Sequence, residues 1–428
     1  MQRRLTLAET GEPQTAQLTE DEAAALTATG LAIAQRTAIV GKWQVAAARK
    51  VGTLQVGPDL QVTVAPKVLI ERLVFMMGYV RDPTFWRDAP VALPQHDDLP
   101  EALAHTFHRF ATKAIEQGLL HGYRTVDDSL HVVRGRIRTD DQLRLRHQMP
   151  LPIEVRYDEF TPDIAENQIL LAATLRLLRM PQVAPATRAG LHRLRLLLAD
   201  VTPFRNGSPL PSWRPSRLNR RYQPALHVAQ LIITASSFEQ LGASREIEVS
   251  GFLFDAWKIF EDFACVALAE AMADPSGRVE YQHRGRLDID GAIAIEPDFT
   301  WWHGTRPVVV VDAKYKTAKS LRFPNADTYQ VLAYCTALGL NDGHLVYAKG
   351  EAQQRDYRVR CSAITIHAHA LNLAASPQSL LSQMGAVAER IRATASMPPS
   401  TIERLLHPAV TVDLTHPVGP VGVDHRDM

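Results

Sequence analysis

A run of four valines that leads directly into charged residues constrains this chain more than any other feature of its sequence. Residues 308–311 are valines, and Asp312, Ala313 and Lys314 follow them. Four consecutive β-branched residues favour a strand that is covered on both faces. Alternate side chains of a strand share a face, so Asp312 and Lys314 point the same way. Burying these charges costs several kcal/mol unless they pair or bind a ligand. The sequence therefore predicts either a structural ion pair or a functional site at the end of this strand.

The length and composition indicate a globular protein of two or three domains. The chain has 428 residues, of which 46% are hydrophobic and 22% charged, enough for each domain to bury a core. The formal net charge of +1 neither requires nor excludes a nucleic-acid partner. The three cysteines form no Cys-x-x-Cys pair, which disfavours a disulfide framework or a zinc ribbon. No signal sequence or apolar run of roughly 18 residues is present, so we expect a cytoplasmic protein with no membrane partner.

The fold expected from these patterns is mixed α/β, and it begins with a small β-rich mixed domain over residues 1–95. Thr19 and Glu22 have the spacing of a capping box, which predicts a short helix that ends at Gly30. Residues 51–68 alternate apolar and polar side chains around a Gly-Pro-Asp turn, which predicts a hairpin. A helix and a linker rich in Pro and Asp are expected next, over residues 69–80 and 81–100.

The middle region, residues 96–245, is predicted to be mainly helical. Apolar residues recur at helical spacing in three segments, over residues 101–123, 167–180 and 186–201.

A short basic segment of this region, "LHVVRGRIR", alternates arginines with apolar residues. The period of two predicts a strand with Arg134, Arg136 and Arg138 on one face and Val133 and Ile137 on the other. One interpretation is a surface that contacts DNA or a protein partner. The alternative is a solvated edge strand whose charges protect it against aggregation.

The last predicted domain, residues 246–395, has an α/β order of elements. A helix, two strand-like pieces, the valine strand, a second helix and a further strand are expected in turn, with the helices over residues 252–272 and 326–338. The tail, residues 396–428, is rich in proline and is expected to pack irregularly or fray.

A second acid lies at a suitable distance from the valine strand. Asp298 begins a strand-like piece fourteen residues before Asp312, enough for one hairpin that returns the two strands side by side. Two acids and a lysine suit phosphodiester hydrolysis with Mg²⁺, because the acids hold the metal through oxygen and the metal polarises the phosphate and activates water. A lysine orients that water or offsets the charge of the transition state. Asp298, Asp312 and Lys314 are therefore the predicted catalytic residues, with Mg²⁺, or Mn²⁺ in its place, as the cofactor.

The spacing of these residues matches the PD-(D/E)xK nuclease pattern, with Pro297 and Asp298 followed by thirteen residues and then the Asp-Ala-Lys triplet. Glu261 lies on a predicted amphipathic helix and is a candidate third metal ligand beside Asp298 and Asp312; the alternative is a solvated helix acid. Gln330 and Tyr334 are four residues apart and share a helical face. Their spacing resembles RecB-like nucleases, in which this helix lies beside the active site and helps to hold DNA; the alternative is ordinary helix surface.

Several longer segments resemble one family, McrC, the nuclease subunit of McrBC-type restriction systems specific for 5-methylcytosine. They are "GLLHGYRTVDDSLHVVRGRI", "YDEFTPDIAENQILLAATLRLL", "RLNRRYQPALHVAQLII" and the catalytic segment through "DTYQVLAY". The resemblance implies a restriction-endonuclease-like C-terminal domain and a separate ring-forming AAA+ GTPase or ATPase partner. It also implies that the N-terminal domain, residues 1–95, is the region that contacts this partner. It also implies that Asp298, Asp312 and Lys314 are the residues that catalyse DNA cleavage. Lys316 joins the three arginines as a candidate for DNA or partner contact.

The chain has no Gly-x-x-x-x-Gly-Lys-Ser/Thr loop, so no nucleotide is expected to bind it in the P-loop manner. Two other functions stay open at this point. One is a stand-alone RecB-like nuclease of DNA repair or phage defence, and the other is a non-catalytic DNA-binding activator of an AAA+ motor.

Overall fold

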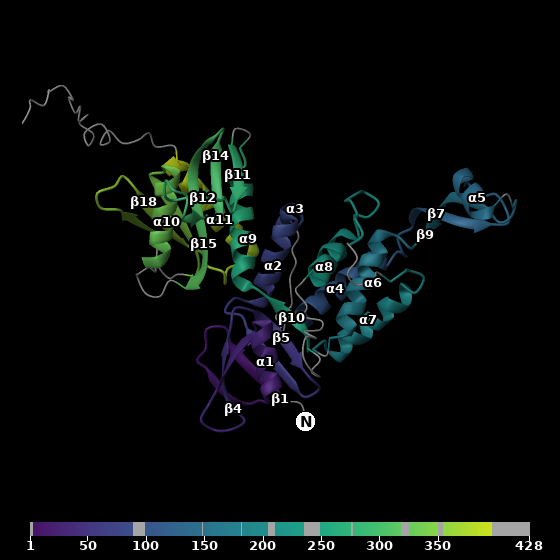
Figure 1. The fold of residues 1–428 in the computed structure, drawn as a ribbon, viewed down its shortest axis with the longest axis horizontal. Helices are drawn as coiled ribbons and strands as arrows, with labels where there is room; N and C mark the ends of the chain where they lie inside the picture. The colour runs from purple at the N-terminus through teal and green to yellow at the C-terminus, as the bar shows by residue number, and fades with distance from the viewer. Residues whose placement is uncertain are drawn as a thin grey trace, which may run out of the picture.

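The computed structural model describes residues 3–88, 99–147, 149–180, 182–203, 210–234, 249–274, 277–317, 325–349 and 354–395. These residues form the expected mixed α/β fold, arranged as an N-terminal lobe, a helical middle lobe and a C-terminal lobe (Figure 1). The predicted tail and residues 89–98 of the predicted linker lie outside the described residues.

The N-terminal lobe contains two sheets and three helices. The sheets have the strand orders β1-β6-β5-β10 and β2-β4-β3. The predicted hairpin is confirmed as β5 and β6, and the predicted capping box of Thr19 and Glu22 starts α1, which ends at Gly30 with φ 72°. The elements of the N-terminal lobe are β1 (Arg3–Ala8), β2 (Gln14–Gln17), α1 (Glu20–Thr29), β3 (Ala32–Arg36), β4 (Lys42–Ala47), β5 (Val51–Val56), β6 (Leu60–Ala65), α2 (Ile70–Arg81) and α3 (Pro83–Asp88).

The fourth strand of the larger sheet, β10 (Val249–Phe254), comes from much later in the chain and pairs antiparallel with β5. The sequence-based prediction of a helix from residue 252 is wrong here, because the helix begins only at Ala256. Gly251 allows the close pairing: a Cβ at this position would lie 2.3 Å from the carbonyl oxygen of Thr53. The chain therefore returns to the N-terminal sheet before it enters the C-terminal lobe.

The middle lobe packs four helices against one another and extends an arm. The arm consists of residues 122–161, and Figure 1 shows it projecting from the helices on the side remote from the C-terminal lobe. Its three strands have the order β7-β9-β8. The elements of the lobe are α4 (Leu99–Ile115), β7 (Gly122–Leu130), β8 (Arg136–Ile137), α5 (Thr139–Arg146), β9 (Ile153–Thr161), α6 (Ala165–Leu178), α7 (Pro185–Leu197) and α8 (Gln223–Thr234).

The basic strand predicted over "LHVVRGRIR" is wrong for most of its length, because β8 contains only Arg136 and Ile137. Gly135 interrupts the segment with φ 70°, a conformation that favours glycine. A Cβ at Gly135 would also lie 2.3 Å from the carbonyl oxygen of Arg156. The expected apolar back is not buried either, since Val133 is 56% exposed and Ile137 is 40% exposed.

The C-terminal lobe is built on a six-stranded sheet with the order β11-β14-β15-β16-β18-β17. The strands β14 and β15 form the predicted antiparallel hairpin, and β15, β16 and β18 are parallel neighbours. The elements are α9 (Ala256–Ala271), β11 (Gly277–Tyr281), β12 (Gly285–Arg286), β13 (Ala294–Ile295), β14 (Phe299–His303), β15 (Arg306–Thr317), α10 (Asn325–Leu338), β16 (Asp342–Lys349), β17 (Arg355–Arg358), β18 (Thr365–Ala370) and α11 (Pro377–Ala395).

The valine strand β15 is covered on both faces, as predicted. Val309 and Val311 belong to the core under α9 and α11, and Val310 belongs to a second core under α10. By the alternation of a strand, Asp312 and Lys314 continue the face of Val310. The expectation that these two charges share one face is therefore confirmed.

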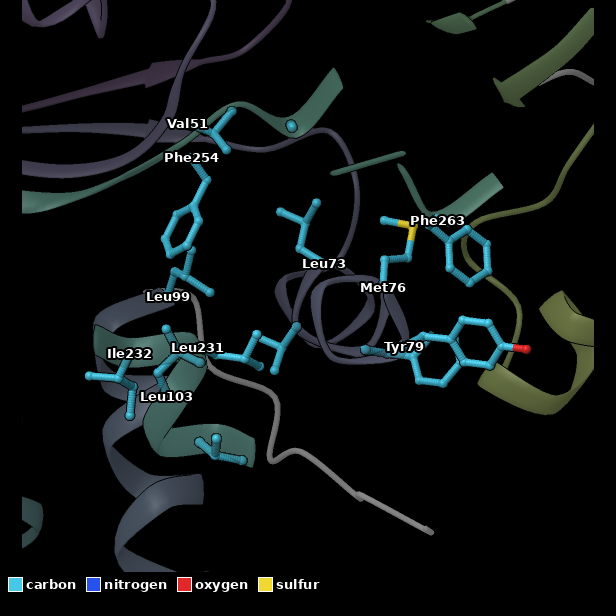
Figure 2. Close-up of a cluster of buried hydrophobic side chains, with 14 of the residues drawn as sticks. Val51, Leu73, Met76, Tyr79, Leu99, Leu103, Leu231, Ile232, Phe254 and Phe263 are labelled. Carbon is cyan, nitrogen blue, oxygen red and sulfur yellow. The ribbon is translucent and has the colours of Figure 1, made fainter. Parts of the chain in front are cut away.

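A continuous core joins the three lobes, and α2 lies at its centre (Figure 2). Tyr79 of α2 packs edge-on against Phe263 of α9, with 5.5 Å between the ring centroids. The side chains around α2 come from the N-terminal sheet, α4 and α8; they include Val51, Phe254, Leu99, Leu103, Leu231 and Ile232. Buried contacts therefore fix the position of α9 against the N-terminal lobe.

Candidate active site

The β14–β15 hairpin brings the two predicted catalytic acids together. Phe299 pairs with Val311, which places Asp298, the residue before β14, opposite Asp312. Oδ2 of Asp298 accepts a hydrogen bond from the main-chain N–H of Ala313 at 2.9 Å. This bond fixes the first acid to the strand that carries the second. The hairpin inferred from the fourteen-residue spacing is thus the element that forms the site.

Lys314 lies against Asp312, with 2.6 Å between its Nζ and Oδ2 of the carboxyl group. The Asp312 side chain is 1% exposed and that of Lys314 is 17% exposed. The contact is an ion pair without the alignment of a hydrogen bond, and within the described segments Oδ2 of Asp312 is a buried atom with no hydrogen-bond partner. Buried carboxylate oxygens are normally hydrogen-bonded. Its charge is balanced by Lys314, and a cation that bound this oxygen would lie beside that ammonium.

Burial perturbs the protonation of both acids. Burial, followed by the charge of the neighbouring Asp298 carboxylate, raises the pKa of Asp312 to about 7 against the opposing effect of Lys314. Burial also raises the pKa of Asp298, which the hydrogen bond from Ala313 partly offsets. Two close carboxyl groups in an apolar environment resist simultaneous ionisation. The site therefore favours a bound cation or a shared proton near neutral pH.

Glu261 approaches the same region from α9. It lines a pocket of about 170 Å³ together with Asp298 and residues of α2, α9 and β11, among them Lys258 and Tyr281, which the sequence did not suggest. Burial, followed by the charge of Asp298, raises the pKa of Glu261 to about 7. Its partial burial beside Asp298 favours a role in the site over that of a solvated helix acid.

The predicted set of three carboxylate ligands is not assembled. Among the described residues, no group of three or more His, Cys, Asp or Glu side chains is placed to hold one metal ion. The assignment of Asp298, Asp312 and Glu261 as metal ligands therefore stays a prediction. Three carboxylates placed together would repel one another, whereas the Lys314 ammonium balances the charge of Asp312.

Gln330 and Tyr334 share a face of α10, as their spacing predicts. Nε2 of Gln330 donates to the Tyr334 hydroxyl at 2.5 Å, and this hydroxyl donates to the main-chain carbonyl of Glu296 at 3.2 Å. Tyr334 is buried, whereas Gln330 is exposed. Tyr334 therefore fixes α10 to the chain two residues before Asp298, and of the two residues Gln330 is the one accessible to solvent.

Lys316 continues the face of Asp312 and Lys314 but is engaged by an acid that the sequence analysis missed. Its Nζ lies 2.8 Å from Oδ1 of Asp327, which is buried in the first turn of α10. The other carboxylate oxygen of Asp327 accepts a hydrogen bond from the Tyr347 hydroxyl at 3.1 Å. The only sequence signal was an acid near the start of a helix, which ordinarily indicates a helix-dipole interaction.

The three arginines of the arm do not form one basic face. Arg138 pairs with the carboxylates of Asp127, Asp141 and Glu154, and Arg134 lies over the ring of Tyr157, 4.0 Å from its centroid. Arg136 is exposed. Figure 1 places the arm far from β15, so these residues lie outside the candidate active site.

Comparison with models of known protein families identifies the family of this chain. Residues 45–348 match the family described as "McrBC 5-methylcytosine restriction system component". The chain belongs to this family. A comparison with curated proteins gave no match.

Two solved structures from Thermococcus gammatolerans contain chains similar to this one. The first is described as a refined half-complex from a tetradecameric assembly of McrB AAA+ hexamers with bound McrC. The similarity has a TM-score of 0.57 at 18% identity and covers 91% of this chain and 100% of the other. The second is a cryo-EM structure of the McrBC complex, with a TM-score of 0.37, 20% identity and 64% and 89% coverage. The first similarity supports the overall fold.

None of the helices in the described segments is both long enough and apolar enough to cross a lipid bilayer.

Proposed function

We propose that this chain is the Mg²⁺-dependent DNA endonuclease subunit of a modification-dependent restriction system and acts with an AAA+ partner. The observation that carries the proposal is the contact of Asp298, Asp312 and Lys314 at one end of a hairpin. Membership of the McrBC family supports the biological context. The pairing of two buried acids with a lysine supports the chemistry, because phosphodiester hydrolysis needs metal ligands and a stabilising cation together.

The donor set fits Mg²⁺. Asp298 and Asp312 would hold the ion, since carboxylate oxygens are its preferred protein ligands and Oδ2 of Asp312 has no hydrogen bond within the described segments. A bound Mg²⁺ would polarise the scissile phosphate and lower the pKa of an attacking water. Both raised carboxyl pKa values support this assignment, because a divalent charge relieves the repulsion between the acids.

The remaining groups of the site have distinct roles. Lys314 stabilises the negative charge that develops on the phosphate, and its burial against Asp312 keeps the ammonium in place. Glu261 has a pKa of about 7, close to the ideal for accepting a proton at neutral pH. Since Glu261 shares a pocket with Asp298, it is suited to take the proton of the attacking water.

The arm is the best-supported contact surface for an AAA+ partner. None of the residues of α5 is buried, and the arm projects away from the rest of the molecule (Figure 1). Its exposed large apolar side chains include Tyr123, Val132, Leu143, Leu145, Met149 and Phe160. Such concentrations of exposed apolar surface mark protein interaction sites. In the similar solved structure, McrC is bound to McrB AAA+ hexamers, so we propose a partner of this class.

The test combines the purified chain, its AAA+ partner, nucleotide, Mg²⁺ and plasmid with or without 5-methylcytosine. Cleavage of methylated plasmid is expected, and Asp312→Asn or Lys314→Met should slow it by about 100-fold or more. The exposed residues Asp290 and Lys113 provide matched controls, since Asp290→Asn and Lys113→Met should cut at the wild-type rate.

Two results would refute parts of the proposal. Wild-type cleavage rates in both active-site variants would disprove the catalytic assignment. Equal cleavage by the wild-type chain with and without partner and nucleotide would disprove the dependence on an AAA+ motor.

A further inference from the structure

Three residues from distant parts of the chain meet beside the catalytic strand. Glu9 follows β1, Lys67 follows β6, and Tyr315 lies in β15 directly after Lys314. The parallel pairing of β1 with β6 brings the ends of these two strands together. The side chains of Glu9 and Lys67 are only 12% and 15% exposed, and Tyr315 is 9% exposed. The three residues are named the Glu9–Lys67–Tyr315 clamp below.

The clamp is closed by several contacts. Nζ of Lys67 donates to the main-chain carbonyl of Tyr315 at 2.8 Å and lies 3.6 Å from the centroid of its ring. The Tyr315 hydroxyl donates to Oε2 of Glu9 at 3.2 Å, and the same oxygen accepts the main-chain N–H of Lys67 at 2.9 Å. Burial and the Glu9 carboxylate raise the pKa of Tyr315, so its hydroxyl remains a donor. Each member of the clamp is therefore bonded to the other two.

The clamp acts where the sheet itself gives less support. The regular pairing of β15 with β16 continues to Lys314, which lies opposite Tyr347, and then shifts before Thr317. The carbonyl of Tyr315 lies in this irregular stretch and is bonded by Lys67. The N-terminal lobe thus supplies a hydrogen bond to the part of β15 that immediately follows the catalytic lysine.

Tyr315 also reaches the other side of the site. Its ring packs against Phe260 of α9, with 6.0 Å between the ring centroids, and Phe260 immediately precedes Glu261. The same aromatic residue therefore neighbours Lys314 along β15 and the helix turn that carries Glu261.

From this geometry we infer that Glu9 and Lys67 are positioning residues through which the N-terminal lobe holds Lys314 and Glu261 in register for DNA cleavage. The inference rests on the proposed nuclease function. It makes the cleavage rate depend on the contact between the N-terminal and C-terminal lobes. It also assigns a role to two residues of a lobe that contains none of the proposed catalytic groups.

The test compares Lys67→Met and Glu9→Gln with Glu12→Gln and Lys113→Met, which change exposed residues of matching type. The single-turnover cleavage rate of the complex with its AAA+ partner is expected to fall roughly 10- to 100-fold in the two clamp variants, because a small displacement of the proposed catalytic groups slows the reaction by about this factor. DNA affinity should stay at the wild-type value. Lys67→Arg, which keeps a donor, should recover part of the rate.

A further measurement separates positioning from general stability. Hydrogen exchange in peptides covering residues 310–317 should become faster, with β5 and β6 unchanged.

The outcomes distinguish this inference from the proposed function. If Asp312→Asn is inactive while Lys67→Met and Glu9→Gln cleave and exchange like wild type, the clamp has no positioning role. If Asp312→Asn cleaves normally, the proposed nuclease function is wrong. If Lys67→Met does not fold, Glu9→Gln and Lys67→Arg decide: a normal cleavage rate and normal hydrogen exchange in both variants overturn the inference.

Discussion

The Asp312→Asn variant is expected to unfold at a higher temperature than the wild-type protein at pH 8 without divalent cations, although it removes a proposed catalytic group. The reason is that Asp312 is buried and its pKa is about 7 in the folded protein, against an ordinary value of 3.8. The folded state therefore binds this proton more tightly than the unfolded state does. Stability from this group is complete below about pH 4 and is lost as the pH rises through 7.

The magnitude follows from the displaced pKa. At about 1.4 kcal/mol for each pKa unit, the displacement of Asp312 corresponds to about 4 kcal/mol at pH 8. Asparagine removes the buried charge but also leaves Lys314 without its ion pair. We therefore expect a net gain of about half this value, about 2 kcal/mol, or roughly 2 °C in the unfolding temperature of a chain of this length.

The assay is thermal unfolding followed by circular dichroism in a chelator at pH 6 and pH 8. The wild type should gain stability at the lower pH, and the variant should change less. Mg²⁺ should stabilise the wild type at pH 8 and have little effect on Asp312→Asn, whereas Asp290→Asn should behave as wild type throughout. A variant that is less stable than wild type at pH 8 would show that the Lys314 pair outweighs the burial of charge, and the electrostatic argument would fail.

Three further outcomes are expected. Glu261→Gln should slow cleavage at least about 100-fold, because it removes the proposed general base. The wild-type cleavage rate should fall below pH 7 as Glu261 is protonated, and a wild-type rate that does not depend on pH would exclude Glu261 as the base. Tyr334→Phe, which removes the bond to Glu296, should lower the free energy of unfolding by about 1 kcal/mol with little change in DNA affinity; a large loss of affinity would indicate direct DNA contact. Leu143→Asp should weaken binding of the AAA+ partner in a titration without lowering the unfolding temperature, and unchanged binding would exclude this part of the arm.

The β14–β15 hairpin could be predicted from the sequence because its signals are local. The valine run determines a buried strand, and the period of two places Asp312 and Lys314 on one face. The fourteen residues from Asp298 to Asp312 limit the connection to a short return of the chain. Each inference needs only neighbouring residues, and the structure bears them out.

Other parts of the molecule depend on contacts between distant segments. Residues 252–254 continue an apolar pattern into α9, so a helix was predicted, but their pairing partner β5 lies about two hundred residues earlier. The alternation around Gly135 gave no indication that Arg138 meets acids from β7, α5 and β9. Asp327 was missed for a different reason: it lies only 11 residues after Lys316, but no pattern in the sequence indicates how α10 is oriented against β15.

The place of β10 in the N-terminal sheet has a consequence for how the protein is made. Strand β5 lies between β6 and β10, so one of its edges stays unpaired on the ribosome until residues 249–254 have been synthesised. An open edge of buried apolar residues invites pairing with other chains. We expect fragments that end within the middle lobe to aggregate, and coexpressed residues 249–395 to rescue them. The N-terminal lobe begins first and is completed only after the middle lobe has emerged.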